Sequence, residues 1–126
     1  MLIRGKEYKF LYTVRANIEI AKGLPGNDIR EIGRILKEGN QVKSTELIGT
    51  MAIAMNRGYL MRKAAEEQTE FNPEDVLTRE IYLDLTHAEE QELEDEIMNA
   101  YVRGNKTEME TENSKGKKTK APENKD

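Results

Sequence analysis

Cysteine and tryptophan are both absent from this sequence, and phenylalanine occurs only twice. Without cysteine the chain can form no disulfide, and it offers no thiolate to a zinc ion or to a covalent reaction intermediate. The single histidine, His87, leaves no second imidazole for a histidine metal cluster or a two-histidine relay. Zinc fingers and cysteine-dependent enzymes are therefore excluded, and we interpret His87 as a solvated side chain.

Long apolar runs and nucleotide-binding motifs are also missing. The longest uncharged stretch, Leu47 to Asn56, covers about half of the roughly 20 residues that a membrane-spanning helix needs. The N-terminus has no apolar signal segment. The glycines are scattered, with neither a Gly-x-Gly-x-x-Gly run nor a phosphate loop. We therefore expect no export signal, no membrane contact and no cofactor.

Charged residues are plentiful and divide the chain in two. Up to Arg103 the sequence holds 14 basic and 19 acidic side chains, whereas the segment from Gly104 holds 6 and 5. That segment has one large apolar side chain, Met109, and cannot offset the entropy of ordering itself. We predict one domain, residues 1–103, and a disordered charged tail, residues 104–126. Because the net charge is −4, we expect no nucleic-acid partner.

The first residues of the chain predict a β-hairpin. Its turn is placed at Gly5-Lys6, because glycine suits a two-residue turn between apolar strands. That register pairs Arg4 with Glu7, Ile3 with Tyr8 and Met1 with Phe10. Cross-strand partners share a face, so the apolar side chains gather on one side: Met1, Ile3, Tyr8, Phe10 and Tyr12. An isolated hairpin is marginal in water, and we expect this side to pack on helices.

Capping residues and apolar spacing predict a mainly α fold, in which the hairpin packs on a compact bundle of about five helices. The first helix is capped by Thr13 and runs to about Lys22, where Gly23 ends it. Its apolar stripe consists of Val14, Ile18 and Ala21.

The next two helices are separated by Gly39-Asn40. Asp28 and Glu31 form a capping-box pattern at the start of the second helix. The third is predicted to run from Ser44 or Thr45 to Gln68, and its first half is apolar or small on every side. A helix without a polar face is usually buried all round, so we expect the third helix at the centre of the core.

Two further helix starts follow along the chain. Asn72 can cap a fourth helix with Pro73 at its first position. Thr86 and Glu89 form a capping box at the start of the last helix, which we expect Gly104 to end. The apolar stripe of this last helix is narrow: Leu93, Ile97, Ala100 and Tyr101.

Two patterns offer weaker functional interpretations. The acidic run Glu89–Glu96 could form a metal site, but a helix spreads these carboxylates over several faces, which favours a solvated surface. The second and third helices could form a helix-turn-helix, but the third begins without arginine, asparagine or glutamine at base-reading positions. An enzyme is therefore not expected, and a small DNA-binding regulator is kept as the alternative function.

Methionines along the third helix point to protein binding. Methionine-rich helices can form adaptable surfaces for partner segments, although core packing is the stronger interpretation. If an exposed groove exists, we expect it along this helix. The residues predicted to contact a partner are Met51, Met55, Tyr59, Met61, Leu93, Ile97 and Tyr101.

The N-terminal pattern resembles that of a known family. Its residues are Ile3, Gly5, Lys6, Glu7, Tyr8 and Phe10, followed by Thr13 at the start of a short helix. In these residues, and in the length and order of the helical body up to Arg103, the chain is similar to tail assembly chaperones of long-tailed bacteriophages and prophages. Arg15, Ala16 and Glu19 match the family's first helix only loosely.

The resemblance implies a helper protein in the host cytoplasm that is absent from the mature virion. Such a protein binds the tape measure protein and assists tail tube subunits to polymerise around it. Family members are often made in two lengths by ribosomal frameshifting, and Lys117-Lys118 is compatible with an A-rich slippery run. The expected partners are therefore the tape measure protein and the tail tube protein, and association into a homo-oligomer is left open.

Overall fold

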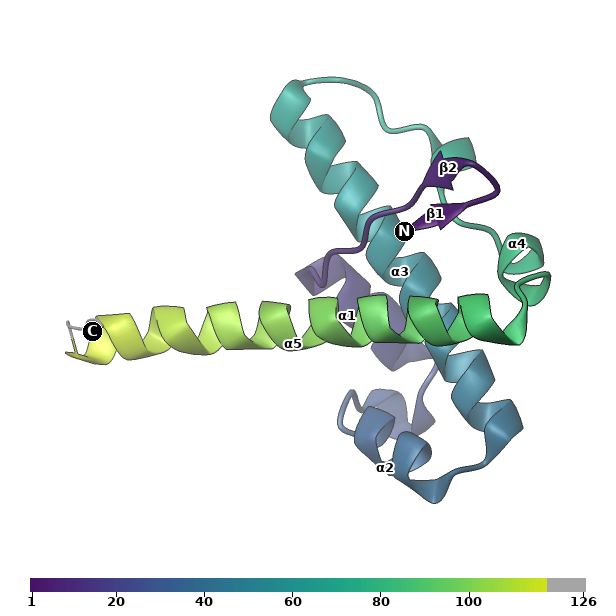
Figure 1. The fold of residues 1–126 in the computed structure, drawn as a ribbon. Coiled ribbons are helices and arrows are strands. Elements are labelled where there is room, and N and C mark those ends of the chain that lie inside the picture. Colours follow the sequence, from purple (N-terminus) through teal and green to yellow (C-terminus); the bar gives the residue numbers. More distant parts are fainter. Residues whose placement is uncertain (118–126) are drawn as a thin grey trace.

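The structure, a computed structural model, describes the backbone of residues 1–117 and the side chains of residues 1–105. Within that range the chain forms a two-stranded antiparallel hairpin, five α-helices and two single-turn 3-10 helices (Figure 1). Their bounds are β1 Leu2–Ile3, β2 Lys6–Glu7, α1 Val14–Lys22, η1 Pro25–Asn27, α2 Glu31–Glu38, α3 Gln41–Glu67, η2 Pro73–Asp75, α4 Arg79–Leu83 and α5 His87–Lys117. The expected mainly α fold with an N-terminal hairpin is confirmed.

Helix α3 is the centre of the fold, as its apolar sequence predicts. It contacts α1, α2, α4 and α5, and Figure 1 shows α5 and α1 crossing it. It begins at Gln41, earlier than predicted, because the side chain of Asn40 accepts a hydrogen bond of 3.0 Å from the Lys43 amide. Gly39, at φ 75°, ends α2 and leaves Asn40 free to cap α3.

The hairpin has the predicted apolar side but a different register. Its turn is formed by Arg4 and Gly5, both at positive φ, and the strand pairs are Leu2 with Glu7 and Ile3 with Lys6. The predicted turn at Gly5-Lys6 is wrong by one residue. In this mirror-image turn both central residues have positive φ, and glycine occupies the second central position, where it is preferred. The apolar side is nevertheless buried at Ile3, Tyr8 and Phe10.

Helix α1 has the predicted ends, and its apolar stripe is largely exposed. Thr13 caps it by accepting from the Ala16 amide at 3.1 Å, and Gly23 follows its last residue. Ala16 and Ile20 are fully buried, however, whereas the exposed fractions of Val14 and Ile18 are 75% and 49%. Val14 and Ile18, on the stripe identified from the sequence, therefore face solvent rather than the core.

The contacts that precede α1 explain this orientation. The Leu11 amide donates to the Met55 carbonyl at 3.0 Å, which fixes the entry of the helix against α3. Gly58 lies under this entry, and a Cβ there would approach the Thr13 hydroxyl to 2.8 Å. With its first residues held so closely, α1 can turn only its small Ala16 and its Ile20 toward α3.

The start of α2 differs from prediction, whereas the start predicted at Asn72 and Pro73 is confirmed but leads to a single turn. The Asp28 side chain accepts from the amide of Arg30, so α2 begins at Glu31 without the predicted capping box. Asn72 caps only the single turn η2, and the chain starts again at Thr78, whose side chain caps α4. Between the two turns the Leu77 amide donates a hydrogen bond to Asn56 on α3, which places the end of this helix, left open by the sequence, after one turn.

Asn56, on α3, is the buried polar residue that connects three segments. Its side-chain oxygen accepts from the Leu77 amide at 2.7 Å, and its side-chain nitrogen donates to the Lys9 carbonyl at 2.9 Å. Only 1% of Asn56 is exposed. The amide thus satisfies backbone groups of the N-terminal segment and of the connection to α4 that α3 would otherwise leave unpaired.

Helix α5 begins as predicted and continues beyond its predicted end. Thr86 and Glu89 form the reciprocal capping box, with hydrogen bonds of 2.9 and 3.2 Å. Gly104 does not end the helix, which continues to Lys117 and extends away from the body in Figure 1. A Cβ at Gly104 would lie 3.0 Å from the Cβ of Tyr12, so this glycine allows α5 to cross the N-terminal segment. Of the predicted tail, residues 118–126 lie outside the described residues.

Candidate functional site

Four of the seven predicted contact residues belong to the core. Met51, Met55, Leu93 and Ile97 are fully buried between α3, α1 and α5. They cannot touch a partner unless these helices separate, so their assignment to a binding surface is corrected. The burial of Met51 and Met55 agrees with the stronger interpretation of the methionines as core.

The other three predicted residues are half-buried and lie apart from one another. Tyr59 lines a depression of about 410 Å³ beside the N-terminal segment, together with Tyr8 and Ala100. Met61 lies on the second half of α3. Tyr101 faces a different hollow, on the side of α5 that meets α1. The structure therefore does not unite the predicted set into one site.

The hollow at Tyr101 includes the exposed apolar side chain of Val14 in its lining. Its volume is about 510 Å³. We call it the α1–α5 groove; its lining residues are Leu11, Tyr12, Thr13, Val14, Asn17, Ile29, Arg62, Tyr101, Gly104 and Asn105. The groove lies where α5 passes the start of α1 and begins to extend from the body.

Two tyrosines that line this groove contact each other. The rings of Tyr12 and Tyr101 are 4.7 Å apart between centroids and tilted by 59°, a favourable aromatic contact. The Tyr12 hydroxyl also donates to the side-chain oxygen of Asn17 on α1. Gly104 permits the close crossing that brings these groups together. The groove is thus preformed by contacts among the N-terminal segment, α1 and α5.

An apolar surface of α1 continues from the groove. Val14 lines the groove itself, and Ile18 and Ala21 follow at spacings of four and three residues, on one face of the helix. We call Val14, Ile18 and Ala21 the α1 outer stripe. The sequence does reveal this stripe, but its spacing alone cannot tell whether it faces the core or solvent.

The opposite side of α1 is anchored by an ion pair. Arg57 on α3 contacts Glu19 at 2.6 Å, and both side chains are about one-third exposed. This pair lies on the flank of α1 that turns toward α3, away from the outer stripe. The Arg57–Glu19 pair therefore does not cover the apolar stripe.

A second, polar hollow lies among the first turns of α3 and α5 and the end of α4. Its volume is about 310 Å³, and Tyr82, His87, Glu90 and Glu94 are among its lining residues. Burial, followed by the charges of Glu90 and Asp95, raises the pKa of Glu94. Among the described residues no three carboxylate or histidine groups lie close enough to hold a metal ion. This hollow therefore offers no assembled metal site.

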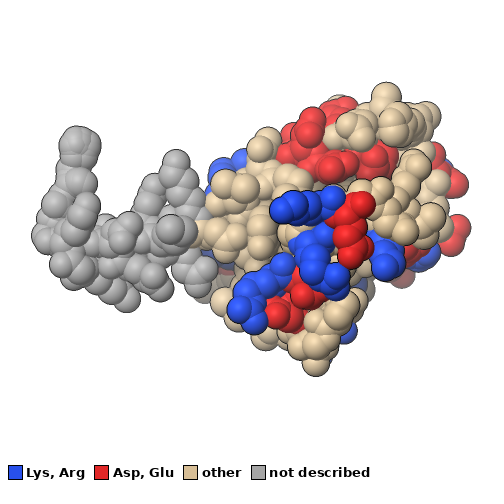
Figure 2. Space-filling view, turned by 90° about the horizontal axis from the view of Figure 1, so that it is seen from below, with Lys and Arg blue, Asp and Glu red and all other residues tan. Residues whose placement is uncertain are grey.

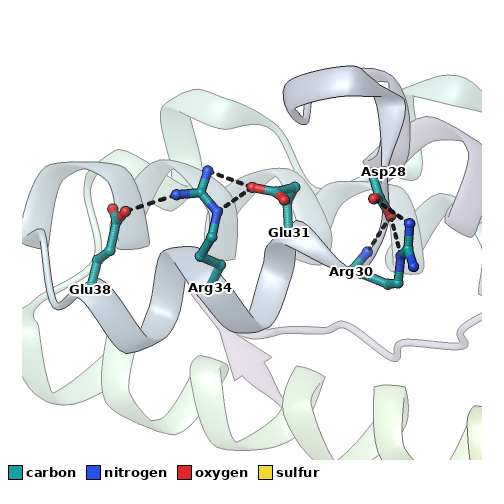
Figure 3. A network of polar contacts seen from close by, with 5 residues as sticks. All are labelled: Asp28, Arg30, Glu31, Arg34 and Glu38. Carbon is teal, nitrogen blue, oxygen red and sulfur yellow. Dashed lines mark hydrogen bonds and ion pairs between the residues drawn. The ribbon is translucent and has the colours of Figure 1, made fainter.

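The outer surface of α2 carries interleaved charges. Figure 2 shows Lys and Arg side chains gathered on this side of the molecule, with Asp and Glu among them. In Figure 3, Arg34 lies between Glu31 and Glu38, which it contacts on α2, and Arg30 contacts Asp28. Its hydrogen bond to Glu31 raises the pKa of Arg34. These arginines are occupied by carboxylates of the same segment.

Of the helices that the structure describes, none combines the length and apolar character needed to cross a bilayer. The candidate site is an open surface, the α1–α5 groove with the α1 outer stripe, rather than an enclosed pocket. Its shape suits a helix or an extended peptide better than a small molecule.

Comparisons with protein-family models, with curated proteins and with solved structures find no match for this chain.

Proposed function

We propose that this chain is a tail assembly chaperone of a long-tailed bacteriophage or prophage. It binds a helical segment of the tape measure protein on the α1–α5 groove and the α1 outer stripe. By covering apolar stripes of that long protein it keeps the partner soluble and assists the polymerisation of tail tube subunits around it. It acts in the host cytoplasm, is absent from the mature virion, and needs no catalytic residue.

The observation that carries this proposal is the exposed apolar face of α1. A helix buried by its own fold would place Val14 and Ile18 inward, yet both are exposed beside a preformed aromatic groove. Exposed apolar surfaces that adjoin a groove commonly mark sites of protein association. A helix with apolar residues three and four positions apart can lie along such a surface.

The residues behind the family resemblance support the proposal by their structural roles. Ile3, Tyr8 and Phe10 are buried in the core, and Gly5 takes positive φ in the hairpin turn. Thr13 caps α1 directly after this segment. Most residues of the pattern thus have a structural role in the hairpin, in the core or at the start of α1, while Lys6 and Glu7 are exposed.

Co-purification with the tape measure protein tests the proposal. The full-length chain is co-expressed with the tape measure protein encoded nearest to its gene, either as wild type or as the double variant Val14→Ser and Ile18→Ser. Both positions are exposed, so the variant should fold. Burying these side chains in a complex contributes about 1–2 kcal/mol each, and we expect at least about a tenfold loss of affinity.

A matched control removes apolar side chains elsewhere. Val42 and Leu83 are 72% and 50% exposed and do not line the groove. The double variant Val42→Ser and Leu83→Ser should bind like wild type. If wild type neither binds the tape measure protein nor increases its solubility, the proposed function is wrong.

A further inference from the structure

The α1 outer stripe has a basic border along one side. Arg15 and Lys22 are seven residues apart, and two helical turns bring them back to nearly the same face, next to Ile18. They are thus about 10 Å apart along the helix axis. The other border of the stripe is Asn17, which is uncharged and hydrogen-bonded to Tyr12. The stripe is therefore asymmetric in charge.

These two cations are available to a partner. Arg15 and Lys22 are exposed, and neither forms an ion pair with any side chain among residues 1–105. By contrast, Arg57 on the neighbouring helix is occupied by Glu19. Arg62, which lines the groove, is in contact with Glu66. On a domain with 14 basic and 19 acidic side chains up to Arg103, the stripe is a locally positive surface.

The chain itself does not supply a good occupant. Residues 106–126 include one large apolar side chain, Met109, and so cannot fill an apolar stripe with side chains at helical spacing. A second copy packed antiparallel on α1 is disfavoured as well. In an antiparallel two-fold contact of α1 with α1, both basic borders would lie on the same side, and like charges would face each other.

We infer that the α1 outer stripe docks an amphipathic helix of the partner that is acidic along one border. Apolar side chains of that helix pack against Val14 and Ile18, and two of its carboxylates, about two turns apart, pair with Arg15 and Lys22. This inference rests on the proposed function and specifies the class of tape measure segment that is bound. It also predicts that the complex weakens as salt is added.

The test is a charge reversal on the full-length chain. Affinity for purified tape measure protein is measured by calorimetry at low and high salt, for wild type and for the double variant Arg15→Glu and Lys22→Glu. We expect about a tenfold or greater loss in the variant at low salt, and a smaller difference at high salt. Lys37→Glu with Lys43→Glu is the matched control, since both lysines are exposed and lie on other helices; it should bind like wild type.

A compensating exchange strengthens the test. Replacing acidic residues by lysine in the bound tape measure segment should weaken wild type and restore binding to the Arg15→Glu, Lys22→Glu variant. Circular dichroism of each variant establishes that α1 still folds. Restored binding would not follow from a purely structural effect of the substitutions.

The possible failures are distinguishable. If wild type binds no tape measure protein, the proposed function fails together with the inference. If Val14→Ser with Ile18→Ser abolishes binding while the charge reversal changes nothing, only the acidic border is refuted. If the charge reversal instead alters sedimentation of the chain alone, or abolishes retention of duplex DNA, the occupant is a second copy or a nucleic acid, and the inference is overturned.

Discussion

Replacing Asn56 by alanine tests how the three segments of the core are held together. The substitution removes both hydrogen bonds of the side chain, those with the Leu77 amide and the Lys9 carbonyl. Leaving the buried Leu77 amide without a hydrogen-bond partner costs about 2–3 kcal/mol. Leaving the partly exposed Lys9 carbonyl without one costs about 1 kcal/mol. We therefore expect Asn56→Ala to lower the free energy of unfolding by about 3 kcal/mol.

Urea denaturation followed by far-UV circular dichroism measures this loss. About 3 kcal/mol is a large part of the stability of a small domain and corresponds to a melting temperature roughly 12–24 °C lower. The matched control is Asn99→Ala on an exposed position of α5, where alanine's higher helix propensity should leave stability equal or slightly increased. A difference between Asn56→Ala and wild type below about 0.5 kcal/mol would refute the role assigned to this side chain.

Three further substitutions follow from local geometry. Gly49→Ala places a Cβ 2.7 Å from the buried ring of Tyr82 and should destabilise the fold by about 1–3 kcal/mol in urea titrations. Thr86→Ala removes half of the capping box of α5 and should cost about 1 kcal/mol by the same measurement. Burial raises the pKa of Glu94, so the folded state binds the proton of this carboxyl more tightly than the unfolded state does. The contribution of Glu94 to the free energy of unfolding is therefore present at low pH and is lost as pH rises through the raised pKa. Glu94→Gln should therefore be more stable than wild type at neutral pH and equal to it below about pH 4, as melting temperatures across pH would show.

Features set by neighbouring residues could be predicted from the sequence. The caps at Thr13 and Thr86 are hydrogen bonds within one helical turn, and both formed as predicted. The apolar first half of α3 indicated a central helix without knowledge of its neighbours, because a helix with no polar face must be surrounded. Such signals do not depend on how distant parts of the chain meet.

Features set by contacts between distant segments could not be predicted. Gly104 has the sequence context of a helix end, yet its role is to let α5 cross Tyr12. The orientation of α1 depends on the contact of Leu11 with Met55, far away in the sequence. One local feature was also missed: the predicted capping pair of Asp28 and Glu31 does not form, because Asp28 accepts from the Arg30 amide, and the sequence does not show which of these two local bonds is preferred.

The candidate site follows from the same distinction. The stripe of Val14, Ile18 and Ala21 was visible in the sequence, but only the packing of Ala16 and Ile20 against α3 shows that it faces solvent. Met51 and Met55 on α3 were equally visible and proved to be core. An apolar stripe identifies a surface that must be covered, and the fold decides whether the chain covers it itself.

The most direct test of the account is a thiol-labelling footprint of α1. Because the chain has no cysteine, Ile18→Cys introduces the only thiol. Val42→Cys is the control: this position is exposed and lies on α3, about 30 Å along the helix from Arg62, which lines the groove. A maleimide should label both variants rapidly in the free chain. Adding the tape measure protein should slow the labelling of the Ile18→Cys variant and leave that of the Val42→Cys variant unchanged. Slow labelling of Ile18→Cys in the free chain, or equal rates with and without the tape measure protein, would contradict the claim that the outward face of α1 is the binding surface.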